Sequence, residues 1–255
     1  MSPKAVSPDQ FHSIPSKLSG TRHFALVVIV CRGAYYRDRL SADKLLRCYE
    51  IASERIRQYL EAEIQFMISS LHGKSLVLEL GCGYGRVMRE VSQHVSWIVG
   101  NDISKESMDL AKSYMKDCCN YSLFMMDASQ MAFRSSTFDA VFCIQNGISA
   151  FGANKARLIA ESVRVTRDSG TILFSSYPPK IWDARLEWFR KQSQLGLIGE
   201  IDEEKTHDGT ISCKDGFEAT TVSDDQFAEL FNELRLNASI TEVDESSIFS
   251  KVIKR

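Results

Sequence analysis

The residues with the clearest chemical potential in this sequence are acids and glycines that follow short apolar runs. Residues 77–85 read VLELGCGYG, so Glu79 is followed by three glycines at alternate positions. Glycine suits a strand end where the chain turns sharply and a ligand comes close to backbone atoms that a Cβ would shield. Asp102 ends the next apolar run, about 20 residues after Gly81, where a carboxylate can accept hydrogen bonds from both ribose hydroxyls of an adenosine. The pattern predicts a nucleoside site, and a plain strand-to-helix turn is the alternative.

Two later apolar runs also end in polar residues. Asp127 and Ala128 close the run 121–126, and Gln145 and Asn146 follow the run 138–144. Ligands of parallel sheets bind outside the carboxyl ends of the strands, which is where these residues would lie. Asp127 has an alternative role as the cap of a following helix.

The spacing of apolar residues predicts the elements that hold these positions. From Ser41 to Leu71 it has the period of a helical face, and Ser41 and Ser53 are plausible N-caps, so we expect either two successive helices or one that breaks near Ala52. Beyond Gly73, short apolar runs alternate with helical segments. Strands are expected at 75–80, 97–101, 121–126, 138–144 and 171–177, and helices at 86–95, 104–118 and 154–166. Such alternation indicates a doubly wound, mainly parallel α/β sheet with helices on both faces.

The last third of the chain departs from this alternation. Residues 181–195 have the pattern of an amphipathic helix, and residues 198–221 alternate around the turn signal His207-Asp208-Gly209, which predicts a β-hairpin insert. Ser223 is expected to cap a helix that ends at Leu234. Two strands, 238–243 and 248–253, should then complete the sheet.

With these residues in place, the sequence resembles the class I S-adenosylmethionine-dependent methyltransferases, over residues 73–180 for the core and to residue 255 for the topology. E-x-G-x-G-x-G at Glu79 to Gly85 is similar to their first motif, and residues 100–104, GNDIS, resemble their second. The family implies a seven-stranded, Rossmann-like sheet that ends on an antiparallel hairpin, unlike that of dehydrogenases. It also implies S-adenosyl-L-methionine as the cofactor.

The resemblance assigns roles to particular residues. It places the methionine part of the cofactor near Glu79, Gly81 and Gly83, with Cys82 between the glycines. The ribose would lie on Asp102 and the adenine against Ile103, with Asp127 and Ala128 at the adenine amino group. Gln145 and Asn146 would face the cofactor and the acceptor. No metal is expected, because the sequence has no CxxC pair and no HExxH.

Composition narrows the partners and the compartment. The chain has 31 basic and 33 acidic residues, so no global basic field favours a nucleic acid. Seven cysteines, an odd number without a spaced framework, indicate reduced thiols in a cytoplasmic protein. The apolar segment 24–31 is too short to span a bilayer, so no membrane partner is expected. That segment should be a buried strand or packing segment, and a targeting peptide is the alternative.

These features divide the chain into five parts. Residues 1–40 are a partly mobile leader, 41–72 an N-terminal helical cap, 73–180 the cofactor-binding core, 181–222 an acceptor-side insert, and 223–255 the final helix and antiparallel strands. The acceptor is expected above the carboxyl edge of the sheet, between the N-terminal helices and residues 178–222.

We expect the acceptor to be a small molecule that receives the methyl group by in-line displacement, which needs positioning and exclusion of water more than a strong base. Two weak candidates for a base are His207, which could equally be an exposed turn residue, and Tyr36, which with Tyr35 could cover the cofactor or simply pack. Methylation of RNA or protein is disfavoured, because Gln145-Asn-Gly147 stands where amino-group methylating enzymes have N-P-P-Y. A non-catalytic cofactor-binding protein is the third possibility.

Overall fold

The computed structural model describes residues 32–255, so the apolar segment 24–31 lies outside the described residues. Seven strands form the main sheet: β1 (Leu76–Leu80), β2 (Trp97–Asp102), β3 (Tyr121–Met125), β4 (Phe138–Cys143), β5 (Thr166–Ser176), β8 (Ala238–Val243) and β9 (Ser247–Ile253). Their order is β3-β2-β1-β4-β5-β9-β8. Strands β1 to β5 pair in parallel, and β9 pairs antiparallel with both β5 and β8. This confirms the predicted fold class, including the closing antiparallel strands.

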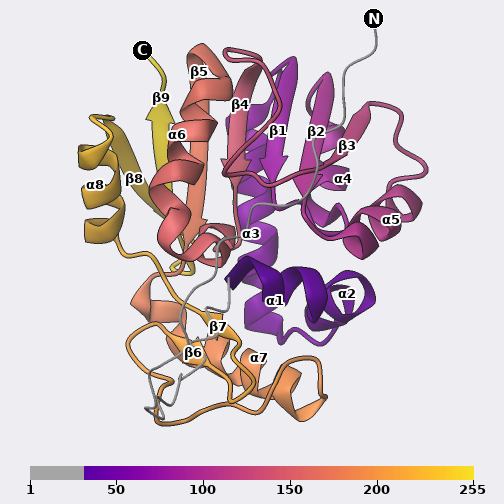
Figure 1. Cartoon of the computed structure of the whole chain (residues 1–255), viewed down its shortest axis with the longest axis vertical. Coiled ribbons are helices and arrows are strands. Elements are labelled where there is room, and N and C mark those ends of the chain that lie inside the picture. The colour runs from indigo at the N-terminus through magenta and orange to yellow at the C-terminus, as the bar shows by residue number, and fades with distance from the viewer. Residues whose placement is uncertain (1–31) are drawn as a thin grey trace, which may run out of the picture.

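Eight α-helices surround the sheet in the described part of the chain. They are α1 (Arg32–Asp38), α2 (Ala42–Glu50), α3 (Glu54–Leu71), α4 (Arg86–Ser92), α5 (Lys105–Tyr114), α6 (Lys155–Val165), α7 (Trp182–Gln194) and α8 (Asp224–Glu233), and the short 3-10 helices are η1 (Gly147–Asn154) and η2 (Pro179–Ile181). Figure 1 shows α6 and α8 in front of the sheet and α3 and α4 behind it. No described helix is long and apolar enough to cross a membrane.

The two faces of the sheet are both covered because its central strands carry mostly apolar side chains on both faces. Side chains alternate between faces, so Val77 packs with α3 and α4 while its neighbour Leu78 packs with α6 and α8. All six residues of β4 are buried, although Asp139 is among them. This double burial fixes the carboxyl ends of β1 to β5 along one edge.

Two of the predicted helix caps are present. Ser53 accepts a hydrogen bond from the Ile56 backbone N–H, and it separates α2 from α3, so the segment 41–71 forms two helices. Ser223 begins α8 with a capping box, in which its side chain bonds the Gln226 backbone and Gln226 bonds back. These local bonds explain why the helix starts were readable from the sequence.

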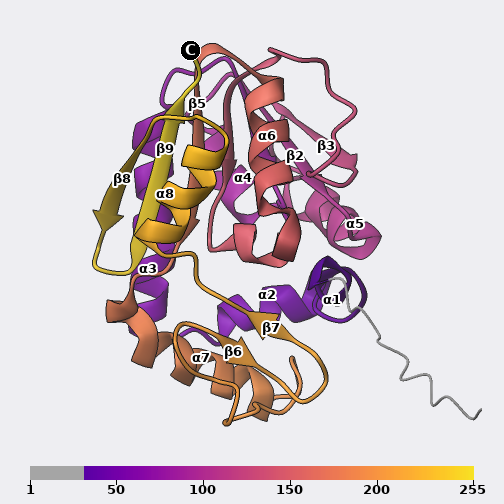
Figure 2. The ribbon, with the colours of Figure 1, turned by 60° about the vertical axis from the view of Figure 1, so that its left-hand side comes forward.

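A separate layer lies beyond the carboxyl edge of the sheet. It contains α1, α2, the start of α3, α7 and a two-stranded sheet of β6 (Ile211–Ser212) and β7 (Glu218–Ala219). Figure 2 shows this layer below the main sheet, with α7, β6 and β7 at its far side. Its own apolar cluster includes Tyr35, Trp188 and Phe217. We call this layer the roof.

The hairpin insert is present, with its turn at the predicted residues. Asp208 and Gly209 form a tight turn with positive φ angles, and antiparallel bridges join His207 to Thr210 and Ile201 to Cys213 across it. The paired strands β6 and β7 form a second, adjoining hairpin that flanks residues 213–217, where Gly216 has φ +94°. Both turns carry an Asp-Gly signal, and only the first was recognised in the sequence.

Candidate functional site

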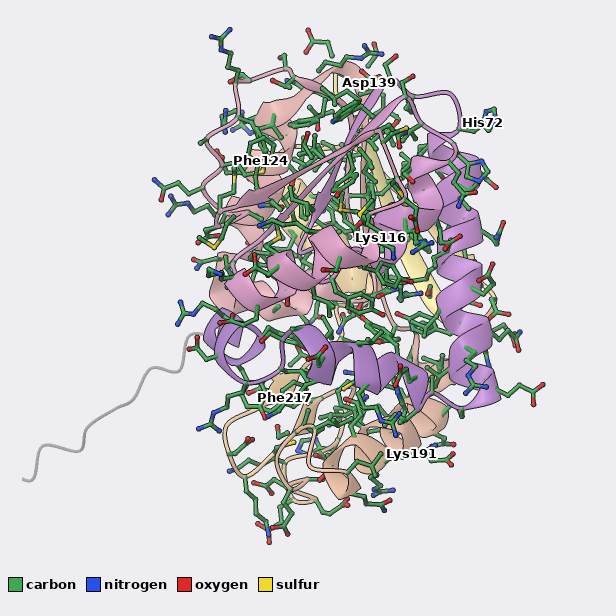
Figure 3. All side chains as sticks on the ribbon, turned by 90° about the vertical axis from the view of Figure 1, so that its right-hand side faces the viewer. His72, Lys116, Phe124, Asp139, Lys191 and Phe217 are labelled. Carbon is green, nitrogen blue, oxygen red and sulfur yellow. The ribbon has the colours of Figure 1, made fainter. Side chains whose placement is uncertain are left out.

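A cavity of about 1380 Å³ lies between the carboxyl edge of the sheet and the roof. The residues that the family resemblance assigned to the cofactor all line it: Glu79, Gly81, Cys82, Gly83, Asp102, Ile103, Asp127, Ala128, Gln145 and Asn146. In Figure 3, Phe217 of the roof lies beyond this edge, whereas Asp139 lies at the opposite end of the molecule. The topology therefore brings these polar positions from four strands to one place.

The glycine loop after β1 adopts a backbone that other residues rarely take. Gly81 has φ +69° and Gly83 has φ +53°. The N–H groups of Gly81 and Cys82 both donate to the Asn101 carbonyl, at 2.9 and 3.0 Å, which ties the loop to β2. A Cβ on Gly83 would lie 3.0 Å from the Leu45 side chain of α2. The loop is therefore held open toward the cavity and closely covered by the roof.

Asp102, at the end of β2, holds the glycine loop in place. Its carboxylate accepts the Gly83 N–H at 2.9 Å and the Ser104 N–H at 2.8 Å. Burial raises the pKa of Asp102 above its ordinary value, and these backbone donors act in the opposite direction. Each oxygen retains acceptor capacity beyond its single backbone bond. A ligand with paired hydroxyl groups could use it, since Asp102 and Ile103 both line the cavity.

Glu79 is a buried acid with an unused oxygen. Only 5% of the residue is exposed, and its Oε2 has no hydrogen-bond partner among the described residues. Burial raises the pKa of Glu79 to about 8, an effect that the Arg86 charge opposes and the Asp102 charge reinforces. An unpaired buried carboxylate is costly, so this geometry suits a ligand that brings a cation or a hydrogen-bond donor.

Asp127 has a local structural role as well as a place on the cavity wall. Its Oδ1 accepts both the backbone N–H and the hydroxyl of Ser129, each at 2.7 Å. No helix follows Asp127, so the alternative role as a helix cap is wrong. Asp127 instead caps a turn formed by residues 127–130. Ala128 lies beside it and is buried.

Gln145 and Asn146 both adopt left-handed backbone conformations, with φ +56° and +57°. The Asn146 side chain bonds to protein groups, donating to the Thr220 carbonyl at 2.8 Å and accepting from the Ser176 hydroxyl at 2.9 Å. It therefore ties the end of β4 to β5 and to the insert. The Gln145 side chain accepts from the Tyr49 hydroxyl at 3.0 Å, and its Nε2 has no partner among the described residues.

A buried acid that the sequence analysis did not single out supports this loop. Glu63 of α3 is completely buried, and its carboxylate accepts the Gln145 N–H at 2.9 Å and the Ser247 hydroxyl at 2.8 Å. Burial raises the pKa of Glu63 to about 6, which the hydrogen bonds moderate. The sequence contained a signal for this buried acid, because Glu63 falls on the apolar face of its helix, one turn after Tyr59.

The roof half of the cavity is aromatic. Its walls include Tyr36, Tyr49, Tyr177, Trp188, Phe189 and Phe217. Trp188 donates its indole N–H to the Cys48 carbonyl at 2.8 Å, which joins α7 to α2. The Tyr35 hydroxyl donates to Asp215 at 2.7 Å, which joins α1 to the insert. Residues 32–38, placed within the leader by the sequence analysis, thus take part in the roof.

The two candidate bases lie in different environments. The His207 side chain is 66% exposed, pairs with Asp208, and does not line the cavity, so the structure does not bring it to the site. Tyr36 does line the cavity and packs on Phe217. Burial raises the pKa of Tyr36 well above its ordinary value, so this phenol stays protonated at neutral pH and suits hydrogen-bond donation better than proton removal.

Comparison with known proteins supports a single family. Residues 77–170 match the family described as "Methyltransferase domain". No curated protein matches the chain significantly.

Three solved structures share the fold, and the similarity extends over nearly the whole of each of their chains. The PH0226 protein of Pyrococcus horikoshii is 20% identical, with a TM-score of 0.61 over 87% of this chain and 99% of its own. The N-methyltransferase NodS of Bradyrhizobium japonicum, solved with S-adenosyl-L-homocysteine, is 13% identical, with a TM-score of 0.59 over 88% and 98%. Magnesium protoporphyrin IX methyltransferase of Synechocystis, solved with S-adenosylmethionine, is 12% identical, with a TM-score of 0.59 over 88% and 97%.

The matched segment contains the strands and loops that form the polar half of the cavity, from Glu79 to Asn146. The sheet order and the closing antiparallel strands agree with it. Residues 77–170 are therefore a methyltransferase domain, and the chain has the Rossmann-like fold of the class I methyltransferases.

Proposed function

We propose that this chain binds S-adenosylmethionine in the polar half of the cavity and transfers its methyl group to a small molecule held under the roof. One observation carries the proposal: a single cavity joins the acids at the strand ends to an aromatic enclosure. Two of the solved structures named above contain S-adenosylhomocysteine or S-adenosylmethionine, which supports the choice of cofactor.

The polar residues fit this cofactor in their order along the sheet. Asp127, Asp102 and Glu79 follow the adjacent strands β3, β2 and β1, which are spaced about 4.8 Å apart. The adenine would lie at Asp127, the ribose on Asp102, and the ammonium group at the unpaired oxygen of Glu79. Ile103 and Ala128 would supply apolar contacts, and the backbone of Gly81 and Gly83 would allow close approach.

When bound, the cofactor supplies a methyl group already activated by a sulfonium charge. The task of this chain is then to align the acceptor atom and keep water out. Tyr49 and Gln145 stand where the polar and aromatic halves meet, and their mutual hydrogen bond fixes both side chains. No described residue that lines the cavity is a histidine. The site therefore suits an acceptor atom that needs no strong base.

The roof favours a small acceptor over RNA or protein. Helices α1, α2 and α7 and residues 213–219 cover the cavity, and hydrogen bonds from Tyr35 and Trp188 hold them together. A folded macromolecule would have to displace this packed layer. The balance of 31 basic and 33 acidic residues also offers no broad attraction to a phosphate backbone.

The test is to follow a labelled methyl group. Cell extract is incubated with the protein and S-adenosylmethionine labelled in its methyl group, then divided by ultrafiltration into small molecules and macromolecules. We expect label that depends on the protein in the small-molecule fraction. Label in RNA or protein would support the alternative acceptor class, and no transfer despite cofactor binding would support a non-catalytic binding protein.

A further inference from the structure

The cavity contains a second feature that the proposed function leaves unexplained: two side chains in contact with Tyr49, Arg86 and Gln145, have nitrogen donors without partners among the described residues. The Arg86 guanidinium lies over the Tyr49 ring, 4.7 Å from its centre. Its Nε and Nη2 atoms are buried and have no hydrogen-bond partner among the described residues. Gln145, at the hydroxyl end of the same ring, leaves its Nε2 unpartnered in the same way.

These unpartnered donors are costly for the protein alone. The edge of a buried guanidinium normally finds a carboxylate or carbonyl acceptor, because a buried donor without one has lost its hydrogen bonds to water. The nearby acids do not accept hydrogen bonds from Arg86, because no described ion pair includes Arg86. The Glu63 carboxylate instead accepts hydrogen bonds from Gln145 and Ser247. Arg185, a fully buried arginine that does not line the cavity, differs in part: its terminal nitrogens donate to the carbonyls of Gly209 and Ala219, and only its Nε has no partner among the described residues.

The geometry of Arg86 suits a planar anion. The contact with Tyr49 orients the guanidinium plane, and its edge presents two parallel N–H groups, the arrangement that pairs with a carboxylate. Arg86 lines the cavity between the polar half and the aromatic half. The charge of Arg86 reaches groups on both sides: burial raises the pKa of Glu79 and of Tyr177, and the Arg86 charge opposes both rises.

We propose that Arg86, assisted by Gln145 and oriented by Tyr49, is a carboxylate-binding subsite for a small molecule in the cavity. This inference rests on the proposed function for the identity of the molecules present. Two carboxylates could reach the subsite, the one on the methionine part of the cofactor and one on the acceptor. The chemistry is the same for both, and the source can be decided by experiment.

The experiment uses the full chain and two matched pairs of ligands. S-adenosylmethionine and its decarboxylated form differ only by the carboxylate of the cofactor, and they are titrated into the free protein. Benzoate and benzamide differ in charge at similar shape, and they are titrated into protein saturated with S-adenosylhomocysteine. Each titration is repeated with Arg86→Met and with Arg89→Met.

Arg89 is the matched control for Arg86. It lies on the same helix and its guanidinium also lies over a tyrosine ring, that of Tyr114 at 5.2 Å, but it does not line the cavity. Loss of hydrogen bonds to a charged group should weaken binding by roughly 10- to 100-fold. Arg86→Lys keeps the charge but not the two parallel N–H groups, so it should weaken binding less. This variant replaces Arg86→Met if Arg86→Met does not fold.

A cofactor carboxylate at Arg86 would make S-adenosylmethionine bind at least tenfold more tightly than its decarboxylated form, and Arg86→Met would remove the difference. An acceptor carboxylate would instead give a preference for benzoate over benzamide that the same variant removes. Three results would overturn the subsite. Both ligands of each pair could bind equally well, a preference could survive Arg86→Met, or a preference could be lost equally in Arg89→Met. If no adenosyl ligand binds, the proposed function fails, and the benzoate pair on ligand-free protein still decides the subsite.

Discussion

Asp102 has a structural role and a proposed binding role in one carboxylate. It fixes the glycine loop through Gly83 N–H and the next turn through Ser104 N–H, yet it still faces the cavity. The sequence suggested only the ribose contact. The structure adds that the acid holds the glycine loop in place.

Asp102→Ala should therefore weaken S-adenosylhomocysteine binding by about 1.5–3 kcal/mol, the range for hydrogen bonds to a charged group. Folding should survive, because the residue lies at a strand end. Calorimetric titration gives the affinity, and a thermal melt without ligand checks the fold. Asp102→Asn, which keeps the shape and some acceptor capacity, should lose less. A folded Asp102→Ala variant with unchanged affinity would mean that the ribose lies elsewhere.

Glu79 predicts a pH dependence of binding. Its pKa of about 8 means that the ligand-free protein holds Glu79 protonated below pH 8 and ionised above it. An ammonium group binds the ionised form, so affinity for S-adenosylhomocysteine should rise from pH 6 to pH 8, by at most about tenfold per unit, and then level off. Titrations at several pH values, in buffers that report proton release, measure this slope.

Glu79→Gln separates this effect from the other buried acids, Glu63 and Asp102. The variant cannot ionise at this position, so the slope between pH 6 and pH 8 should largely disappear while the fold remains. A wild-type affinity that does not change with pH would show that no cation meets Glu79.

At the scale of elements, the sequence was informative where the determinants are local. Alternating apolar runs located β1 to β5, and short-range bonds at Ser53 and Ser223 marked helix starts. The hairpin turn at Asp208-Gly209 was predicted, whereas the second turn at Asp215-Gly216, which β6 and β7 flank, was missed. Arg86 was overlooked although it directly follows the glycine loop. Its proposed role depends on the contact with Tyr49, which lies on α2, far away in the sequence.

The roof elements should control the acceptor and not the cofactor. Phe217, in the turn between β6 and β7, packs on Tyr35, Tyr36 and Phe189 and lines the cavity. Phe217→Leu keeps an apolar side chain but changes the wall, so we expect a several-fold slower transfer to the acceptor in extract, with cofactor affinity unchanged within about twofold.

Phe231→Leu provides the matched control for this variant. Phe231 is equally buried, but it packs on Phe227 in the main core beneath α8, away from the cavity. Transfer should continue at the wild-type rate after this change. If both variants slow transfer equally, the effect reflects stability; if neither does, the acceptor does not contact the roof at Phe217.

At the scale of the whole molecule, the sheet order decides where the ligands lie. Four successive strand ends, from β3 to β4, carry Asp127, Asp102, Glu79 and Gln145 to one edge, and a separate apolar layer closes over them. The glycine loop and the alternating runs made this arrangement predictable. The sequence also predicted the N-terminal helices and residues 178–222 above this edge. It could not predict the contacts that close this layer, because they are long-range, such as that of Tyr35 with Asp215.

The most direct measurement is titration of the full chain with S-adenosylhomocysteine, with NAD as the control ligand. We expect one site of roughly micromolar affinity, as is common for such cofactors, and competition with S-adenosylmethionine. NAD should give no binding, because the E-x-G-x-G-x-G spacing and the antiparallel strands β8 and β9 differ from those of dinucleotide enzymes. Absence of both heat and competition for either adenosyl ligand, or tighter binding of NAD, would contradict the proposed site.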